Sequence, residues 1–191
     1  MSRLRIPALA ATAMATVFAL AGCVSQQTYE AQVQKTDALQ QKYDQLNQQM
    51  SSEIAAHEMH IERLQNALRV TVNDQLLFPS GDWQMPPDAQ QSIAKIAKIL
   101  APMQQTKIVV NGYTDNVPIG PGLVRQGVTS NLILSQKRAE NVAQFMISQG
   151  VNPSLVSTQG FGDADPVASN DTADGRAQNR RVEIVLAGSG N

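Results

Sequence analysis

KIVVNGY, residues 107–113, is a short apolar run centred on three consecutive β-branched residues. Such residues favour extended backbone, and an apolar run of this length predicts a strand in the interior of a sheet. On either side of it lie longer segments whose apolar residues recur every three or four positions, the spacing of a helix with one buried face. The sequence around this run therefore predicts a strand between two helices.

The helix before the strand is predicted to begin at Pro86 or Pro87 and to end before Pro102. Proline suits the first helical turn, because the backbone N–H that it lacks would have no partner there. The same residue beyond the last turn stops the helix. The apolar positions at helical spacing are Ile93, Ile96, Ala97 and Leu100.

The helix after the strand is predicted to begin near Ser130 or Asn131, since both residue types cap helix N-termini well, and to end at Gly150. Between strand and helix, a long loop with several Gly and Pro residues runs from Thr114 to Thr129. The helix carries its apolar residues at Leu134, Val142, Phe145 and Met146.

Three further strands are predicted, at residues 70–78, 156–159 and 181–186. In the last of them Val182, Ile184 and Leu186 occupy every second position and therefore share one face, which is predicted to be buried. The order is then β-α-β-α-β-β. This order predicts an α+β domain over residues 70–187, with helices on one face of a mixed sheet and a short tail at 188–191.

Residues 29–69 have a different pattern, with apolar or nearly apolar positions about 3.5 residues apart on average, which is the period of a coiled coil. They are predicted to form a long, polar helix with one narrow apolar seam, since they contain no Gly or Pro. Two interpretations remain open: a helix that pairs with itself or with another chain, and a solvated spacer. The seam consists of Tyr29, Val33, Thr36, Leu39, Tyr43, Leu46, Met50, Ile54, His57, Ile61, Leu64 and Leu68.

The N-terminus carries Arg3 and Arg5 followed by an apolar stretch from Ile6 to Ala21, the pattern of a secretory signal. The stretch ends in Leu20-Ala21-Gly22-Cys23, which resembles the lipobox of bacterial lipoproteins. The resemblance implies that residues 1–22 are removed and that Cys23, the only cysteine, is acylated, with residues 23–28 as a tether. A plain transmembrane helix is the alternative, weakened by Pro7 and Gly22. By resemblance to lipoprotein sorting, an Asp after the cysteine would signal retention in the inner membrane, so Val24 at this position points to the outer membrane.

Four segments of the predicted domain together resemble the OmpA-like, peptidoglycan-associated domain. They are Phe78-Pro79-Ser80-Gly81, Val110-Asn111-Gly112-Tyr113-Thr114-Asp115, Asn131-Leu132-Ile133-Leu134-Ser135-Gln136-Lys137-Arg138-Ala139 and Asn179-Arg180-Arg181-Val182. The resemblance spans about residues 70–187. It implies a wall-binding protein whose partner is peptidoglycan and whose site needs no metal and no cofactor.

In that family, residues at the positions of Asp115 and Arg138 bind the diaminopimelate of the peptide stem, with a further contact from the position of Arg180. A carboxylate suits an ammonium, and a planar guanidinium suits a carboxylate. Asn131 lies seven residues before Arg138, so both project from the same side of a helix, toward the end of the strand, and Asn131 is also predicted to bind peptidoglycan. On residue type alone, Asp115 could cap the loop, Arg138 could pair with that Asp, and Asn131 could serve only as an N-cap.

Two features depart from the family pattern. Tyr113 stands where most relatives carry His, and the loop over residues 116–130 is longer than in the shorter members. The run Thr114-Asp115-Asn116-Val117-Pro118-Ile119 is most similar to the flagellar stator branch of the family.

Other function classes are disfavoured. The formal net charge of -1 argues against a nucleic-acid partner. From Val70 to Asn191 there is no His and no Cys, which removes the usual zinc and nucleophilic chemistry of wall-cutting enzymes. The histidines of His57-Glu58-Met59-His60 are three apart, not the four that a zinc protease helix needs. A stator would carry an acid in its membrane segment, and residues 6–29 contain none. An envelope scaffold acting through residues 29–69 stays compatible with wall binding.

Overall fold

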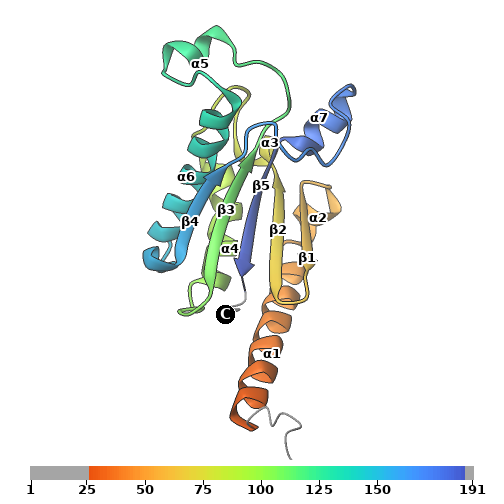
Figure 1. The fold of residues 1–191 in the computed structure, drawn as a ribbon, viewed down its shortest axis with the longest axis vertical. Coiled ribbons are helices and arrows are strands. Elements are labelled where there is room, and N and C mark those ends of the chain that lie inside the picture. Colours follow the sequence, from red (N-terminus) through yellow and green to blue (C-terminus); the bar gives the residue numbers. More distant parts are fainter. Residues whose placement is uncertain (1–25, 188–191) are drawn as a thin grey trace, which may run out of the picture. The chain divides into compact units, whose positions relative to one another are not determined.

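The computed structural model describes residues 26–187, so the predicted signal peptide, Cys23 and the tail lie outside the described residues. Within this range the chain forms a five-stranded sheet in the order β1-β2-β5-β3-β4 (Figure 1). Only β3 and β4 run parallel, and the other neighbours are antiparallel, so the sheet is mixed as predicted. The strands are β1 Met59–Arg63, β2 Ala67–Asn73, β3 Lys107–Tyr113, β4 Val156–Gly160 and β5 Arg181–Ala187.

The helices are interleaved with these strands, which confirms the α+β class. The run KIVVNGY is β3, and it lies in the interior of the sheet between β5 and β4, as predicted. The helices are α1 Gln26–Gln49, α2 Ser51–Ala55, α3 Asp74–Leu77, α4 Pro87–Leu100, α5 Pro121–Arg125, α6 Asn131–Ser148 and α7 Ala173–Asn179, with a short 3₁₀ turn, η1, at Pro153–Leu155.

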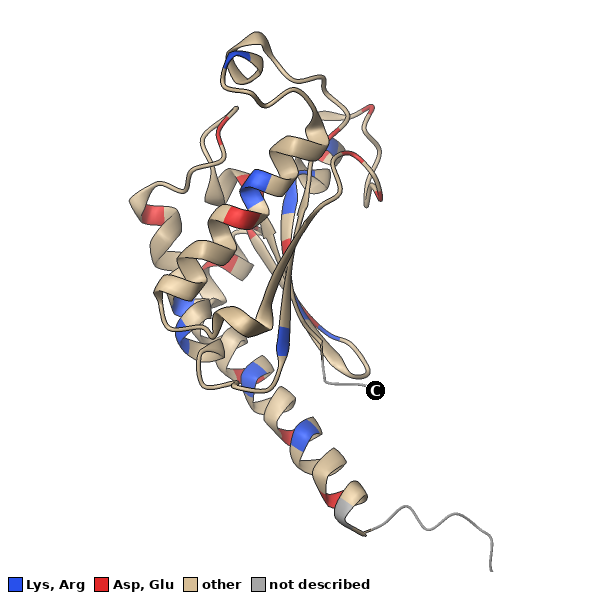
Figure 2. Cartoon of the chain, turned by 60° about the vertical axis from the view of Figure 1, so that its left-hand side comes forward, with Lys and Arg blue, Asp and Glu red and all other residues tan. Residues whose placement is uncertain are grey.

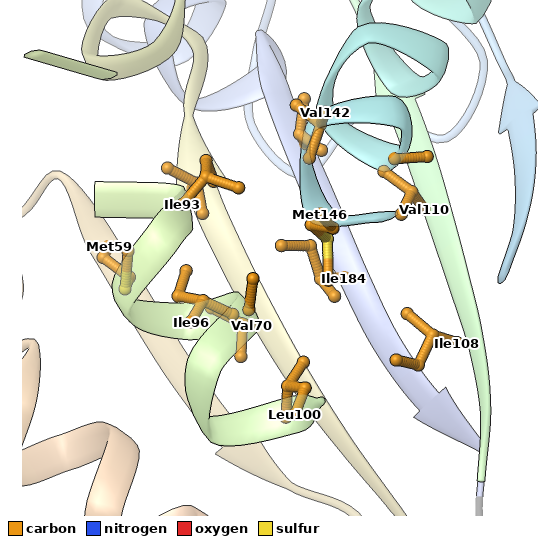
Figure 3. Packing of buried hydrophobic residues seen from close by; sticks show 14 of the residues in the cluster. Met59, Val70, Ile93, Ile96, Leu100, Ile108, Val110, Val142, Met146 and Ile184 are labelled. Atoms are coloured by element: carbon orange, nitrogen blue, oxygen red, sulfur yellow. The ribbon is translucent and has the colours of Figure 1, made fainter. Parts of the chain in front are cut away.

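The apolar core lies between one face of the sheet and helices α4 and α6. Figure 3 shows side chains of both helices directed at the alternate residues of β2, β3 and β5. Burial of each such side chain contributes on the order of 1.5–3 kcal/mol. The core residues labelled there are Met59, Val70, Ile93, Ile96, Leu100, Ile108, Val110, Val142, Met146 and Ile184, all buried.

Two glycines let α6 approach the sheet closely. Gly112 of β3 and Gly160 of β4 are register partners. A Cβ on Gly112 would lie 2.1 Å from the backbone oxygen of Ser135, and one on Gly160 would lie 2.5 Å from the backbone nitrogen of Gln136. Because no side chain of any size fits there, the close approach fixes α6, and with it Arg138, against the ends of β3 and β4.

The prediction of one helix through residues 29–69 is wrong beyond residue 55. Helix α1 ends at Gln49, α2 adds one short turn, and residues 59–63 form the edge strand β1, which pairs antiparallel with β2. The turn before β1 contains no Gly or Pro, and His57 takes the left-handed conformation at φ 59°. Residues 59–62 alternate apolar and polar, but in so short a segment this pattern also fits a helical seam.

From residue 35 onward, the apolar seam of α1 packs into the chain's own core. Leu39, Leu46 and Met50 are buried and belong to the same cluster as the residues of β2 and α4. A coiled coil with a second chain would need these side chains to be exposed in the isolated chain. For these three positions the interpretation as an intermolecular seam is therefore also wrong.

The first predicted strand is shifted. It occupies residues 67–73, and α3 replaces its expected end. The Asn73 side chain accepts a hydrogen bond from the backbone N–H of Gln75 at 3.0 Å and so caps α3. This early helical turn brings Asp74 out of the strand.

The long loop after β3 has a small apolar cluster of its own, formed by Leu123, Val128 and Leu134, with Trp83 and Ile119 packed against it. Helix α5 lies within this loop. Packing of Leu123 and Val128 against Leu134 of α6 therefore helps to hold the loop in place. Among the described residues no helix combines the length and the apolar character needed to cross a bilayer.

Candidate ligand-binding cleft

A cleft of about 750 Å³ opens where β3 ends and α6 begins. Its lining includes every binding residue predicted from the sequence: Asp115, Asn131, Arg138 and Arg180. It also includes Asp74 of α3, which the sequence analysis missed. Residues from four separate parts of the chain thus meet at one end of the sheet.

Arg138 lies at the bottom of the cleft and is almost fully buried, at 4% exposure. Its Nη1 donates to Asp74 Oδ2 at 2.9 Å, its Nε donates to the backbone oxygen of Asp82 at 3.0 Å, and its guanidinium lies 5.1 Å from the ring centroid of Phe78. Burial and then the neighbouring Arg180 lower the pKa of Arg138, while Asp74 opposes that shift. The pairing with Asp115 that sequence alone allowed is not the one found.

Asp74 joins the two arginines. Its second oxygen, Oδ1, accepts from Nε of Arg180 at 3.3 Å. Burial raises the pKa of the Asp74 carboxyl, and the positive charges of Arg138 and Arg180 oppose that shift. A buried carboxylate is tolerated only with partners of this kind, so Asp74 holds both guanidinium groups in position.

Asp115 completes the network. Its Oδ2 accepts from Nη1 of Arg180 at 2.7 Å, and its Oδ1 accepts from the backbone N–H of Val117 at 3.0 Å. The carboxylate therefore both caps the loop and forms an ion pair, but with Arg180. The resulting chain, Arg138 to Asp74 to Arg180 to Asp115, alternates in charge and sums to zero.

Asn131 does not act as the helix N-cap, because the hydroxyl of Ser130 accepts from the N–H of Ile133 and fills that role. Instead the Asn131 amide donates to the backbone oxygens of Asp115 at 3.2 Å and Val117 at 3.1 Å. It thus ties the start of the loop to α6. Its placement beside Arg138 on one side of the helix agrees with the predicted spacing.

Part of the cleft lining is apolar. It is contributed by the loop after β3, through Val117, Pro118, Ile119 and Leu123. The cleft therefore combines paired charges with aliphatic surface. This arrangement suits a ligand that carries a zwitterionic head on an aliphatic chain.

Tyr113 takes no part in the cleft. Its ring stacks on Phe161 with 4.8 Å between ring centroids, and the guanidinium of Arg181 lies 3.7 Å from the Tyr113 centroid. Burial, followed by the charge of Glu183, raises the pKa of its hydroxyl. The substitution of Tyr for the usual His therefore leaves the lining of the cleft unchanged.

The charged residues are mixed in sign over the part of the chain that is drawn in colour (Figure 2). Within residues 26–187, no three His, Cys, Asp or Glu side chains gather as metal ligands would. The cleft contains ion pairs and hydrogen-bonding groups suited to holding a ligand.

The fold and the cleft define a small α+β domain with a ligand-binding site at one end of its sheet. The chain belongs to the OmpA family, whose model matches residues 77–180, more than half of the sequence. The resemblance inferred from the four sequence segments is thereby confirmed.

Individual relatives agree with this assignment. Over 110 residues the chain is 42% identical to the probable lipoprotein YiaD of Escherichia coli K12, covering 58% of this chain and 47% of YiaD. It is 33% identical over 123 residues to the peptidoglycan-binding protein ArfA of Mycobacterium tuberculosis H37Rv, covering 64% of this chain and 35% of ArfA. The chain thus spans less than half the length of either relative.

Among solved structures, the cell wall anchor of the T6SS from Pseudomonas aeruginosa superimposes with a TM-score of 0.68 at 30% identity. The match covers 75% of this chain and 97% of that structure. It includes more of this chain than the family model does, so the shared fold is not limited to residues 77–180.

Proposed function

We propose that this protein binds peptidoglycan non-covalently, by holding the meso-diaminopimelate of the peptide stem in the cleft. We further propose that acylated Cys23 fixes it to the outer membrane, with the domain facing the periplasm. The observation that carries the first proposal is the charge-alternating network of Asp74, Arg138, Arg180 and Asp115 in a cleft that also has aliphatic lining residues.

The free end of diaminopimelate is an amino acid, with one ammonium and one carboxylate. Asp115 supplies the carboxylate that accepts hydrogen bonds from the ammonium. Arg138 and Arg180 each use Nε and Nη1 in the hydrogen bonds described above, and within the described residues neither uses Nη2. Two donors therefore remain for the ligand's carboxylate.

A zwitterion keeps the site neutral, because the network itself has equal numbers of positive and negative groups. A lysine stem would bring the ammonium without the carboxylate and would leave the second charge unmatched. The aliphatic wall formed by Val117, Pro118 and Ile119 suits the methylene chain of the ligand. These features favour diaminopimelate over lysine.

The affinity for one stem is expected to be weak. Each charge-assisted hydrogen bond contributes on the order of 1.5–3 kcal/mol, but the ligand replaces bonds that Asp115 and Arg180 already make to each other. We expect a Kd on the order of micromolar to millimolar. A tethered protein facing a repeating polymer needs no more, because the effective concentration of stems is high.

Relatives support this proposal. ArfA is named as a peptidoglycan-binding protein, the Pseudomonas aeruginosa structure is named as a cell wall anchor, and YiaD is named as a probable lipoprotein. Each name describes that relative.

The test is retention of the full-length protein on purified peptidoglycan sacculi in a mild detergent. Sacculi containing meso-diaminopimelate should retain the wild type, and sacculi with lysine stems should retain it poorly. Asp115→Asn should be lost from both, whereas the matched control Asp163→Asn, at an exposed position outside the cleft, should bind as the wild type does. Equal retention of Asp115→Asn and wild type would contradict the proposal.

A second role is favoured by the exposed apolar residues of α1. Tyr29 and Val33 lie four residues apart on the helix and are 66% and 40% exposed. We propose that this segment pairs with a second copy or with another envelope protein, as a scaffold would. Sedimentation of the full chain should show a dimer that Val33→Glu dissociates.

A further inference from the structure

One polar group of the cleft has no hydrogen-bond partner. Three buried side-chain atoms of the described residues lack one: Arg69 Nε, Asn111 Oδ1 and Thr114 Oγ1. Of these residues only Thr114 lines the cleft, and it is 5% exposed. Buried hydroxyl groups are nearly always hydrogen-bonded, so this exception calls for a physical reason.

The neighbours of Thr114 are already engaged with one another. Its own backbone N–H donates to the backbone oxygen of Gly162 at 2.7 Å, which continues the chain pairing beyond β3. The Asp115 carboxylate holds Arg180 and the N–H of Val117, and the Asn131 amide holds two backbone oxygens. The hydroxyl therefore takes no part in the hydrogen bonds of the cleft in the ligand-free protein.

We propose that Thr114 is a ligand-binding residue whose hydroxyl hydrogen-bonds the amino-acid end of the ligand held by Asp115 and Arg180. This inference rests on the proposed function, because it assigns a third contact within the same cleft. A hydroxyl donates one hydrogen bond and accepts others, so it can serve either the ammonium or the carboxylate. The unmet hydrogen bond is a cost that the free protein carries and that the bound ligand removes.

This role predicts opposite effects on binding and on stability. Valine has nearly the shape of threonine with a methyl group in place of the hydroxyl. Thr114→Val therefore removes an unsatisfied polar group from the free protein, which is neutral or stabilising. The same change removes a contact from the complex and weakens binding. A hydroxyl that served only the fold would make both effects unfavourable.

The test uses the full-length protein and the tripeptide L-Ala-γ-D-Glu-meso-diaminopimelate, with Kd measured by isothermal titration calorimetry and Tm by thermal melting. Thr114→Val should bind roughly tenfold more weakly than wild type, equivalent to about 1.4 kcal/mol, with a Tm no lower than that of wild type. Thr114→Ser retains the hydroxyl and should bind within about threefold of wild type.

The outcomes separate the two proposals. Wild-type binding of the tripeptide with equal binding by Thr114→Val would overturn the role of Thr114 and leave the proposed function intact. Weaker binding by Thr114→Val together with a lowered Tm would assign the hydroxyl to the fold and also overturn the inference. Absence of tripeptide binding by the wild type would overturn the proposed function, and the inference with it.

Discussion

The sheet carries two networks of buried charge, one in the cleft and one on the face opposite the helices, and they use their arginines differently. On that face Arg181 pairs with Glu183 at 2.8 Å and lies over the ring of Tyr113, while Arg69 approaches Glu183 at 3.6 Å. Arg181 uses all three guanidinium nitrogens, donating to Glu183 and to the backbone oxygens of Asn179 and Asp165. In the cleft, Arg138 and Arg180 each use two.

This difference shows what distinguishes a structural ion pair from a ligand site in one small domain. Both networks contain buried Arg and acidic residues, so residue type and burial do not separate them. In the cleft, Nη2 of both Arg138 and Arg180 is left without a hydrogen-bond partner among the described residues, whereas Arg181 uses all three guanidinium nitrogens and lies over the ring of Tyr113. The following predictions test whether that distinction holds.

The largest change, a loss of unfolding free energy, is expected for Arg138→Met. It leaves Asp74 buried with only the more distant Arg180, and removing one partner of a buried pair typically costs about 3–5 kcal/mol. Urea denaturation should report this loss of unfolding free energy. The double variant Asp74→Leu with Arg138→Met should regain most of it, because no unpaired charge remains. A single variant as stable as wild type would show that the pair contributes nothing to the fold.

Asp115→Asn is expected to reduce affinity for the diaminopimelate tripeptide by roughly 10–100-fold, about 1.4–2.7 kcal/mol, because the group that accepts from the ammonium loses its charge. Stability should fall by about 1 kcal/mol or less, since its partner Arg180 is one-quarter exposed. Calorimetric titration and thermal melting of the same sample measure the two effects. A large loss of stability without a loss of affinity would mean that Asp115 belongs to a structural ion pair and not to the ligand site.

Arg181→Met should show the opposite pattern to Asp115→Asn, with a loss of stability and an unchanged affinity for the tripeptide. Loss of its bonds to Glu183 and two backbone oxygens is expected to lower the free energy of unfolding by about 1–3 kcal/mol. The tripeptide Kd should stay within about twofold of wild type, because Arg181 does not line the cleft. Weakened binding in a variant that remains folded would place this second network in the binding function.

The smallest effect is expected for Lys95→Met. Lys95 pairs with Glu53 at 3.0 Å and links α4 to α2. Burial favours the neutral acid, yet hydrogen bonds from Ser52 and Lys95 hold the pKa of Glu53 below its ordinary value of 4.5. Because the folded pKa is the lower one, the pair contributes stability above about pH 4.5 and loses it as pH falls through the folded value.

At pH 7 we therefore expect Lys95→Met to be less stable than wild type by under about 1 kcal/mol, since Lys95 is almost half exposed. Urea denaturation at pH 7 and at pH 3 measures the difference between the two proteins. The difference should shrink at the lower pH. If wild type and Lys95→Met differ in stability by the same amount at pH 7 and at pH 3, the Glu53 carboxylate is not involved.

Much of the fold could be predicted because several elements carry local signals. Pro87 at the start of α4, Ser130 at the cap of α6 and the alternation in β5 each act within a few residues. Strand β1 lacked such a signal, since its turn uses His57 at positive φ with no Gly or Pro. Strand β1 forms by pairing with β2, and a short apolar pattern does not predict which segments pair.

The same reasoning explains what was found and missed in the candidate site. Asp115 and Arg138 could be named because they belong to recognisable segments. Asp74 could not, because its partners Arg138 and Arg180 lie 64 and 106 residues further along the chain. A sequence signal did exist: an acid between the apolar residues of β2 and Leu76-Leu77-Phe78 must find a partner when it is buried.

The burial of Leu39 within the domain sets a limit on how far the protein can reach. A spacer helix over residues 29–69 would measure about 60 Å at 1.5 Å per residue. With Leu39 fixed in the core, at most the segment from Cys23 to Leu39 is available, about 50 Å when fully extended and about 25 Å as a helix. In the proposed arrangement this segment sets the largest distance between the membrane surface and Leu39, so the domain must stay close to the membrane to which it is attached.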